Sequence, residues 1–168
     1  LHVRSRRQRQ MCIRDRYQLR AEGLTLAVVA TRWNARVVEQ MTERAVDTAR
    51  EHGVKTDLYF VDGALELPVV VQACAKRYDA VVALGCVIRG ETAHFQYVCD
   101  SVTEGLTRIA LDEETPIGNG VLTVEEEDQA YERAGGEDAK EDKGAAAVQA
   151  ALSAAVELRK VRSLPLKG

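Results

Sequence analysis

The residues best suited to chemistry stand together in one short segment, in which Gly90-Glu91-Thr92 is followed closely by His94. A helical pattern begins here, so Gly90-Glu91-Thr92 is expected to open a helix, where free backbone N–H groups and the helix dipole attract anions. The Thr92 hydroxyl adds a further donor. An imidazole one turn away can move protons near neutral pH, although a lone histidine is also a common structural residue. The pattern predicts a small anion site beside a candidate acid–base group.

Two further loops carry groups that suit a planar, polar ligand. The first, residues 31–34, holds Trp33, the only tryptophan of the chain, which either belongs to the core or offers its ring for stacking. The second, residues 62–66, ends on the carboxylate of Glu66. The sequence has no GxxxxGK[ST] motif, and Gly118-Asn119-Gly120 lacks the third glycine of a dinucleotide loop. A ligand with a single phosphate therefore fits better than a nucleotide.

Each of these loops follows a run of residues that is typical of a buried strand. Short β-rich runs alternate with helical patterns, which is the signature of βα units and a parallel sheet. Strands are expected at residues 24–30, 57–61, 80–85 and 117–122. Helices are expected at residues 35–52, from 66 onward, 94–111, after 123 and 143–162. The sequence thus predicts an α/β fold, a three-layer α/β/α sandwich with a four-stranded parallel sheet in flavodoxin-like order, which binds ligands beyond the carboxyl ends of its strands.

Capping residues give the expected helix boundaries. Asn34 is expected to cap the first helix, which Gly53 would end. Thr123 precedes an acidic run at residues 125–128. Carboxylates are favoured at the positive end of a helix dipole, so we interpret this run as capping rather than as metal binding.

Length and composition indicate one globular domain, with 168 residues, 46% of them apolar and 29% charged. The net charge of −3 is unevenly distributed, because residues 1–20 hold seven arginines against Asp15 and the rest of the chain is acidic. Residues 1–20 are interpreted as a tail, either a basic arm for RNA or anionic surfaces, or a disordered or artefactual extension. Residues 21–168 are expected to form a single domain whose acidic surface does not bind nucleic acid.

The cysteines and the apolar runs indicate the cellular compartment. The four cysteines form no CxxC pair, so neither a zinc site nor a disulfide framework is expected, and a reducing cytoplasm is the default. The longest apolar run, residues 80–88, is far too short to cross a bilayer. Residues 24–30 follow an arginine-rich leader as a signal peptide would, but a helix follows directly, and we interpret them as a strand.

Six ordered segments together resemble one enzyme family. The segments are Arg32-Trp33-Asn34, Gly63-Ala64-Leu65-Glu66-Leu67-Pro68, Gly85-Cys86-Val87-Ile88-Arg89-Gly90-Glu91-Thr92-Ala93-His94-Phe95, Asn119-Gly120-Val121-Leu122-Thr123, Glu132-Arg133-Ala134-Gly135 and Asp142-Lys143-Gly144. Read in this order, the chain from about residue 24 to 162 resembles the 6,7-dimethyl-8-ribityllumazine synthase family of riboflavin biosynthesis. The resemblance implies condensation of 5-amino-6-(D-ribitylamino)uracil with 3,4-dihydroxy-2-butanone 4-phosphate, releasing phosphate and water, without metal or organic cofactor.

The resemblance also implies roles for individual residues. His94 would be the proton shuttle, and Trp33 would stack on the pyrimidine ring where the family more often has Phe. The remaining pyrimidine and ribityl contacts would come from Asn34, Ala64, Leu65, Glu66, Cys86, Val87, Ile88, Asn119 and Lys143. The phosphate would lie against Gly90, Glu91, Thr92 and Arg133.

Four positions in this set call for comment. Glu91 stands where the family usually has a small or neutral residue, and its carboxylate would repel phosphate unless it points to solvent. Asn119 occupies a position where many members have Phe at the far wall of the pocket. Arg133 and Lys143 match positions that reach the site from the adjacent subunit.

The resemblance implies a homo-oligomer, because the site would draw on two chains. Family members form pentamers, and some pack twelve pentamers into an icosahedral shell that has a tight, glycine-rich loop between the last two helices. Here residues 135–142 make that loop long and strongly charged, so we predict a free pentamer. Two alternatives remain open: a non-catalytic flavin- or lumazine-binding protein of the same fold, and an RNA-binding or interaction module that uses the arginine-rich arm.

Overall fold

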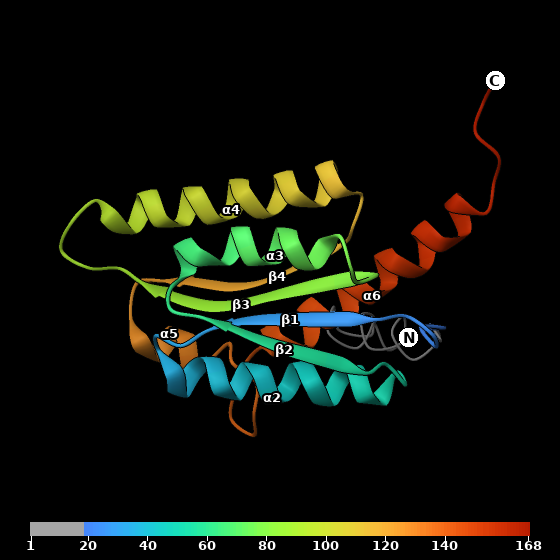
Figure 1. The fold of residues 1–168 in the computed structure, drawn as a ribbon. Helices are drawn as coiled ribbons and strands as arrows, with labels where there is room; N and C mark the ends of the chain where they lie inside the picture. The colour runs from blue at the N-terminus through green and yellow to red at the C-terminus, as the bar shows by residue number, and fades with distance from the viewer. Residues whose placement is uncertain (1–18) are drawn as a thin grey trace, which may run out of the picture.

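Four parallel strands form the centre of the chain, whose computed structural model describes residues 19–168 (Figure 1). The strands are β1 (Leu26–Thr31), β2 (Thr56–Val61), β3 (Ala80–Ile88) and β4 (Ile117–Val124). Their order in the sheet is β2-β1-β3-β4, with every neighbouring pair parallel. This order places the central strand β1 between two neighbours that follow it in the chain. The predicted α/β class and its four-stranded parallel sheet are confirmed.

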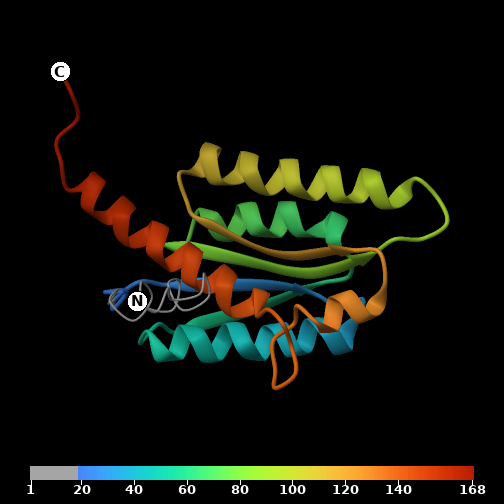
Figure 2. The ribbon, with the colours of Figure 1, turned by 180° about the vertical axis from the view of Figure 1, so that it is seen from behind.

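Helices cover both faces of the sheet and give the three layers. They are α2 (Ala35–Glu51), α3 (Leu67–Ala75), α4 (His94–Glu113), α5 (Glu127–Tyr131) and α6 (Lys143–Arg162), with a 3-10 turn η1 (Ala64–Glu66). Figure 1 shows α3 and α4 over one face, and α2, α5 and α6 over the other; Figure 2 shows the same division from behind. The loops after β1, β2 and β3 therefore emerge at one edge of the sheet, as parallel strands require.

Each interface between sheet and helices has its own apolar core. Leu26 and Val28 of β1 point toward α2 and α6, where Met41 and Leu152 join them. Val29 of the same strand points the other way, into the core under α3 and α4. This alternation follows from the period of two along a strand. Because β1 and β3 are buried on both faces, they hold the loops at their ends on a rigid base.

Glycines allow α6 to lie close against its neighbours. A Cβ atom at Gly118 of β4 would lie 2.3 Å from the Ala147 carbonyl oxygen, and one at Gly144 would lie 2.3 Å from that of Met41. Both distances are shorter than packing permits, so these positions accept only glycine. The start of α6, which carries Lys143, is thereby fixed against α2 and β4.

The predicted basic tail lies largely outside the described residues, since the description begins at Leu19. Leu19 is buried in the core under α2 and α6, and the Arg20 carbonyl accepts a hydrogen bond of 2.8 Å from Nη2 of Arg159. In the described part of the chain, no helix combines the length and the apolar character needed to cross a bilayer.

Candidate active site

The loops after β1 and β2 are bonded to each other at the carboxyl edge of the sheet. The backbone N–H of Arg32 donates to the Val61 carbonyl at 2.7 Å, and that of Trp33 to the Asp62 carbonyl at 3.1 Å. An exposed ion pair joins Arg32 Nη1 to Asp62 Oδ1 at 3.1 Å. Two segments that are 30 residues apart in sequence thus form one continuous wall.

Trp33 and Glu66 project from this wall. Trp33 is 66% exposed, so its ring is not part of the core and is open to contact from outside the chain. Glu66 ends the η1 turn, and its Oε2 accepts a hydrogen bond of 3.0 Å from the backbone N–H of Gly63. Ala64 is half-buried and Leu65 is exposed beside them. An exposed aromatic ring beside a carboxylate suits a planar ligand that carries hydroxyl or amino groups.

Asn34 does not cap α2 as expected. It occupies the N-cap position but has a left-handed backbone (φ 56°, ψ 45°), and its side chain makes no capping bond. Instead its Nδ2 donates to the Cys86 carbonyl at 2.7 Å, 52 residues away. Asparagine tolerates the left-handed region better than most residues, which makes this tertiary bond possible. The bond ties the loop after β1 to the end of β3.

β3 continues three residues beyond its predicted end. Cys86, Val87 and Ile88 were expected in a loop, but they pair with Leu122, Thr123 and Val124 of β4. The Cys86 side chain is buried, and burial, followed by the nearby Glu127, raises the pKa of its thiol to about 11. The thiol is therefore protonated at neutral pH and is a poor nucleophile. This leaves the backbone at the end of β3 as the group that can contact a ligand.

The segment Gly90-Glu91-Thr92 precedes α4 and does not open it, because the helix begins at His94. All three residues are exposed. The Thr92 Oγ1 accepts a hydrogen bond of 3.3 Å from the backbone N–H of His94, two residues on, which is a local threonine turn just before the helix. The prediction that this segment opens the helix is therefore wrong by two to four residues. Its backbone N–H groups belong to a turn directly before the helix.

Arg89 anchors the start of this turn. Its backbone N–H donates to the Val124 carbonyl at 2.9 Å, its Nε pairs with Glu125 Oε2 at 2.5 Å, and its guanidinium lies 4.5 Å from the centre of the Phe95 ring. A cation over an aromatic face and a paired carboxylate both stabilise this position. Glu125 belongs to the acidic run interpreted as capping, yet its carboxylate pairs with Arg89, for which the sequence predicted no role.

His94 is exposed at the first position of α4. The η1 turn that carries Glu66 contacts α4, and both lie on the same face of the sheet. The structure therefore brings the three predicted loops to one edge of the molecule, with the aromatic ring, the carboxylate, the turn and the imidazole along it.

Arg133 follows α5 and Lys143 begins α6, two helices that lie on the other face of the sheet from α4 (Figures 1 and 2). The Lys143 N–H donates to the Arg133 carbonyl at 3.0 Å. The Arg133 guanidinium donates to the Gln129 carbonyl at 2.8 Å, and Lys143 Nζ pairs with Glu141 at 3.1 Å.

Asn119 lies in the middle of β4, opposite Ala83 of β3. It is exposed, and its Oδ1 accepts a hydrogen bond of 3.0 Å from the Val121 N–H on the same strand. Five residues separate Ala83 from Ile88, which is about 16 Å along a strand. Asn119 is thus not beside the loops of its own chain.

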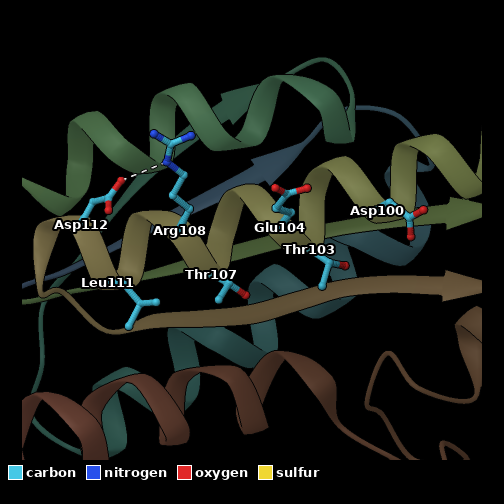
Figure 3. Close-up of a pocket in the computed structure, with 7 residues that line it drawn as sticks. All are labelled: Asp100, Thr103, Glu104, Thr107, Arg108, Leu111 and Asp112. Atoms are coloured by element: carbon cyan, nitrogen blue, oxygen red, sulfur yellow. Dashed lines mark hydrogen bonds and ion pairs between the residues drawn. The ribbon is translucent and has the colours of Figure 1, made fainter.

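A surface hollow of about 620 Å³ lies away from these loops, along the exposed side of α4 (Figure 3). Its seven lining residues all come from this one helix, among them Thr103, Thr107 and Leu111. Arg108 pairs with Asp112 at one end, at 3.2 Å. A hollow formed by a single helix does not enclose a small ligand, so we do not assign the site there. Among residues 19–168, no group of three or more His, Cys, Asp and Glu side chains is placed to hold a metal ion.

The chain is similar to known proteins of one enzyme family. The family described as 6,7-dimethyl-8-ribityllumazine synthase matches residues 23–159. Proteins of that name from Corynebacterium glutamicum (strain R) and Thermobifida fusca (strain YX) are 61% and 57% identical over 143 and 150 residues, which cover 85% and 89% of this chain and 90% and 88% of the relatives. The one from Mycolicibacterium gilvum is 53% identical over 151 residues, 89% of this chain and 94% of its own. The chain belongs to the 6,7-dimethyl-8-ribityllumazine synthase family.

Proposed function

We propose that this chain condenses 5-amino-6-(D-ribitylamino)uracil with 3,4-dihydroxy-2-butanone 4-phosphate to form 6,7-dimethyl-8-ribityllumazine, with release of phosphate and water. The observation that carries the proposal is the gathering of Trp33, Glu66, the 90–92 turn and His94 along one edge of a family member's sheet. The reaction needs two substrates held side by side, and this edge offers a stacking surface next to an anion turn.

The pyrimidine would stack on Trp33. Ala64, Leu65 and Glu66 would contact the ribityl chain and the ring edge, with the Glu66 carboxylate accepting from hydroxyl groups. Backbone groups of Cys86, Val87 and Ile88 would bind the uracil edge. Asn34 supports them, because its amide bonds to the Cys86 carbonyl and orients the end of β3.

The phosphate would lie on the turn formed by Gly90, Glu91 and Thr92. Backbone N–H groups serve this purpose, and the exposed Glu91 side chain is directed to solvent, where it repels the phosphate least. The Thr92 hydroxyl would donate to the phosphate. Arg133 of an adjacent chain would add a charge-assisted bond.

His94 would move the protons. The 5-amino group attacks the ketone carbon, and loss of water forms an imine. Removal of a proton next to the imine expels the phosphate and leaves an enol, which tautomerises to a ketone. The ribityl-bearing nitrogen then attacks this carbonyl carbon, and loss of a second water closes the ring. An exposed imidazole beside the phosphate turn is placed to accept and return these protons. No step requires a metal or an organic cofactor.

The oligomer we propose is a pentamer with a site at each subunit contact. Arg133 and Lys143 flank the start of α6, on the other face of the sheet from α4, which begins at His94; we therefore expect the two sets to meet across a subunit contact. Large apolar side chains are exposed on several elements, among them Leu58 and Phe60 on β2, and Tyr97 and Leu111 on α4. Burial of such residues favours association.

The pentamer should remain free. The 135–142 loop is closed by backbone bonds from Gly135 N–H to Glu141 and from Lys140 and Glu141 N–H to Glu132, and it projects below α2 in Figure 1. Its tip carries Glu137 and Asp138, which would meet like charges between pentamers. Native mass spectrometry should give five chains; a shell of sixty chains or a fully active monomer would contradict this assembly.

We place the protein in the cytoplasm, since its described cysteines, Cys74, Cys86 and Cys99, are free thiols. The partners are two small molecules and further copies of the chain, without nucleic acid or membrane. Residues 21–168 would form the catalytic domain, and removal of residues 1–18 should leave turnover unchanged.

A turnover assay with both purified substrates tests the function directly. Product is followed by its absorbance and fluorescence, and omission of either substrate is the control. Formation of the lumazine at a rate far above the uncatalysed condensation is the expected result. Binding of the lumazine or of a flavin without turnover would favour the alternative of a non-catalytic binding protein.

A further inference from the structure

Gly63 lies against both side chains that the proposed function assigns to the pyrimidine substrate. A Cβ atom at this position would lie 2.5 Å from Cζ3 and 2.6 Å from Cε3 of Trp33, and 3.1 Å from Oε2 of Glu66. The Gly63 N–H meanwhile donates to that same Glu66 oxygen at 3.0 Å. The Trp33 indole ring and the Glu66 carboxylate therefore both contact the same residue, Gly63.

The backbone at Gly63 does not itself require glycine. Its conformation is extended (φ −124°, ψ 177°), which any residue adopts. Gly135, in contrast, has a φ of 78°, where a side chain is strained. The need for glycine at position 63 thus comes from the two side chains that contact it, above all from the Trp33 ring.

We propose that Gly63 is a positioning residue for pyrimidine binding. Because Gly63 has no side chain, the Trp33 ring can lie directly against its α-carbon, and this contact fixes the position and orientation of the ring. The Gly63 N–H holds the Glu66 carboxylate beside that ring. The loop bonds from Arg32 and Trp33 to Val61 and Asp62 keep the two backbones together, so the ring contacts Gly63 closely. This inference rests on the proposed function, in which Trp33 stacks on the substrate.

An added methyl group should displace the ring without unfolding the protein. Trp33 is 66% exposed, and nothing in its exposed position stops it from rotating outward. The atoms that a Cβ would meet, Cε3 and Cζ3, belong to the outer ring of the indole, which phenylalanine lacks. Gly63→Ala should therefore weaken pyrimidine binding only when residue 33 is tryptophan.

The first measurement is fluorescence, because Trp33 is the only tryptophan in the chain. Gly63→Ala should change the emission maximum of Trp33 and increase its quenching by acrylamide, while the melting temperature stays close to that of the wild type. If emission and quenching are the same in both proteins, the contact does not position the ring and the proposal is overturned. This result does not depend on whether the protein is an enzyme.

The second measurement is steady-state kinetics with four proteins: wild type, Gly63→Ala, Trp33→Phe and the double variant. Gly63→Ala should raise KM for the pyrimidine about tenfold, the range expected for loss of base stacking, and change KM for the phosphate-bearing substrate far less. The double variant should return to the KM of Trp33→Phe alone. A double variant as impaired as Gly63→Ala would overturn the proposal, whereas a wild type without turnover would refute the proposed function instead.

Discussion

Asp142 joins the loop before α6 to two different groups, and we expect its removal to cost more than either contact alone. Its Oδ1 accepts from the Ala145 N–H at 3.0 Å as the cap of α6, and its Oδ2 pairs with Arg44 Nε at 2.7 Å. Loss of an N-cap costs about 1 kcal/mol. The ion pair is part-exposed, with 35% and 29% of the two side chains accessible, so we assign it about 0.5–1 kcal/mol.

These magnitudes separate the two contacts. Asp142→Ala removes both and should lower the free energy of unfolding by about 1.5–2 kcal/mol. Asp142→Asn keeps a good capping group and loses only the charge, so it should cost about 0.5–1 kcal/mol. Arg44→Met removes the other partner of the ion pair and is the matched control. In the Asp142→Asn background it should lower the free energy of unfolding only slightly further.

Urea denaturation at one fixed protein concentration measures these differences, since association also contributes to stability. Equal losses for Asp142→Ala and Asp142→Asn would show that the cap contributes nothing. Full additivity of Arg44→Met and Asp142→Asn would show that the pair is not coupled. Either result would refute our reasoning about this loop.

Three further predictions concern catalysis and pH. His94→Ala should lower kcat by about 10², the low end for acid–base catalysis, with both KM values largely kept, and an unchanged rate would remove the imidazole from the mechanism. Arg133→Ala should raise KM for the phosphate-bearing substrate by about 10- to 100-fold and leave the pyrimidine KM much less affected, which steady-state kinetics would decide. Lys76, with Gln72, donates hydrogen bonds that lower the pKa of Glu113, so this stabilisation is present above the unfolded-state pKa and is lost as the pH falls through the lower folded-state pKa. Lys76→Met should therefore raise the pKa of Glu113 in an NMR titration, and an unchanged value would contradict the assignment.

The main elements of the fold could be predicted because their signals are local. The β1 and β3 runs are apolar throughout, and the stripe of Phe95, Val98 and Val102 indicates α4 directly. The end of β3 was predicted three residues too early, although the apolar run of residues 80–88 has the same bounds as the strand. The pairing of residues 86–88 with β4 settles that the whole run is strand.

The sequence predicted which residues lie at the candidate site better than it predicted the bonds that those residues make. Trp33, Glu66 and His94 stand at the ends of predicted elements, so their gathering at one edge follows from the topology. The bond from Asn34 to Cys86 did not follow, because the local preference of asparagine is to cap a helix. The roles implied for individual site residues stay predictions until the assays above are done.

The position of Arg133 and Lys143 over the far face of the sheet gives the proposed assembly a genetic property. A chain damaged at His94 still carries an intact basic pair, and a chain damaged at Arg133 still carries an intact imidazole. In a ring where each site joins one chain to the next, co-expression of the two damaged forms would rebuild about a quarter of the sites. Mutations of site residues would therefore restore activity to one another only when the two residues reach the shared site from different chains.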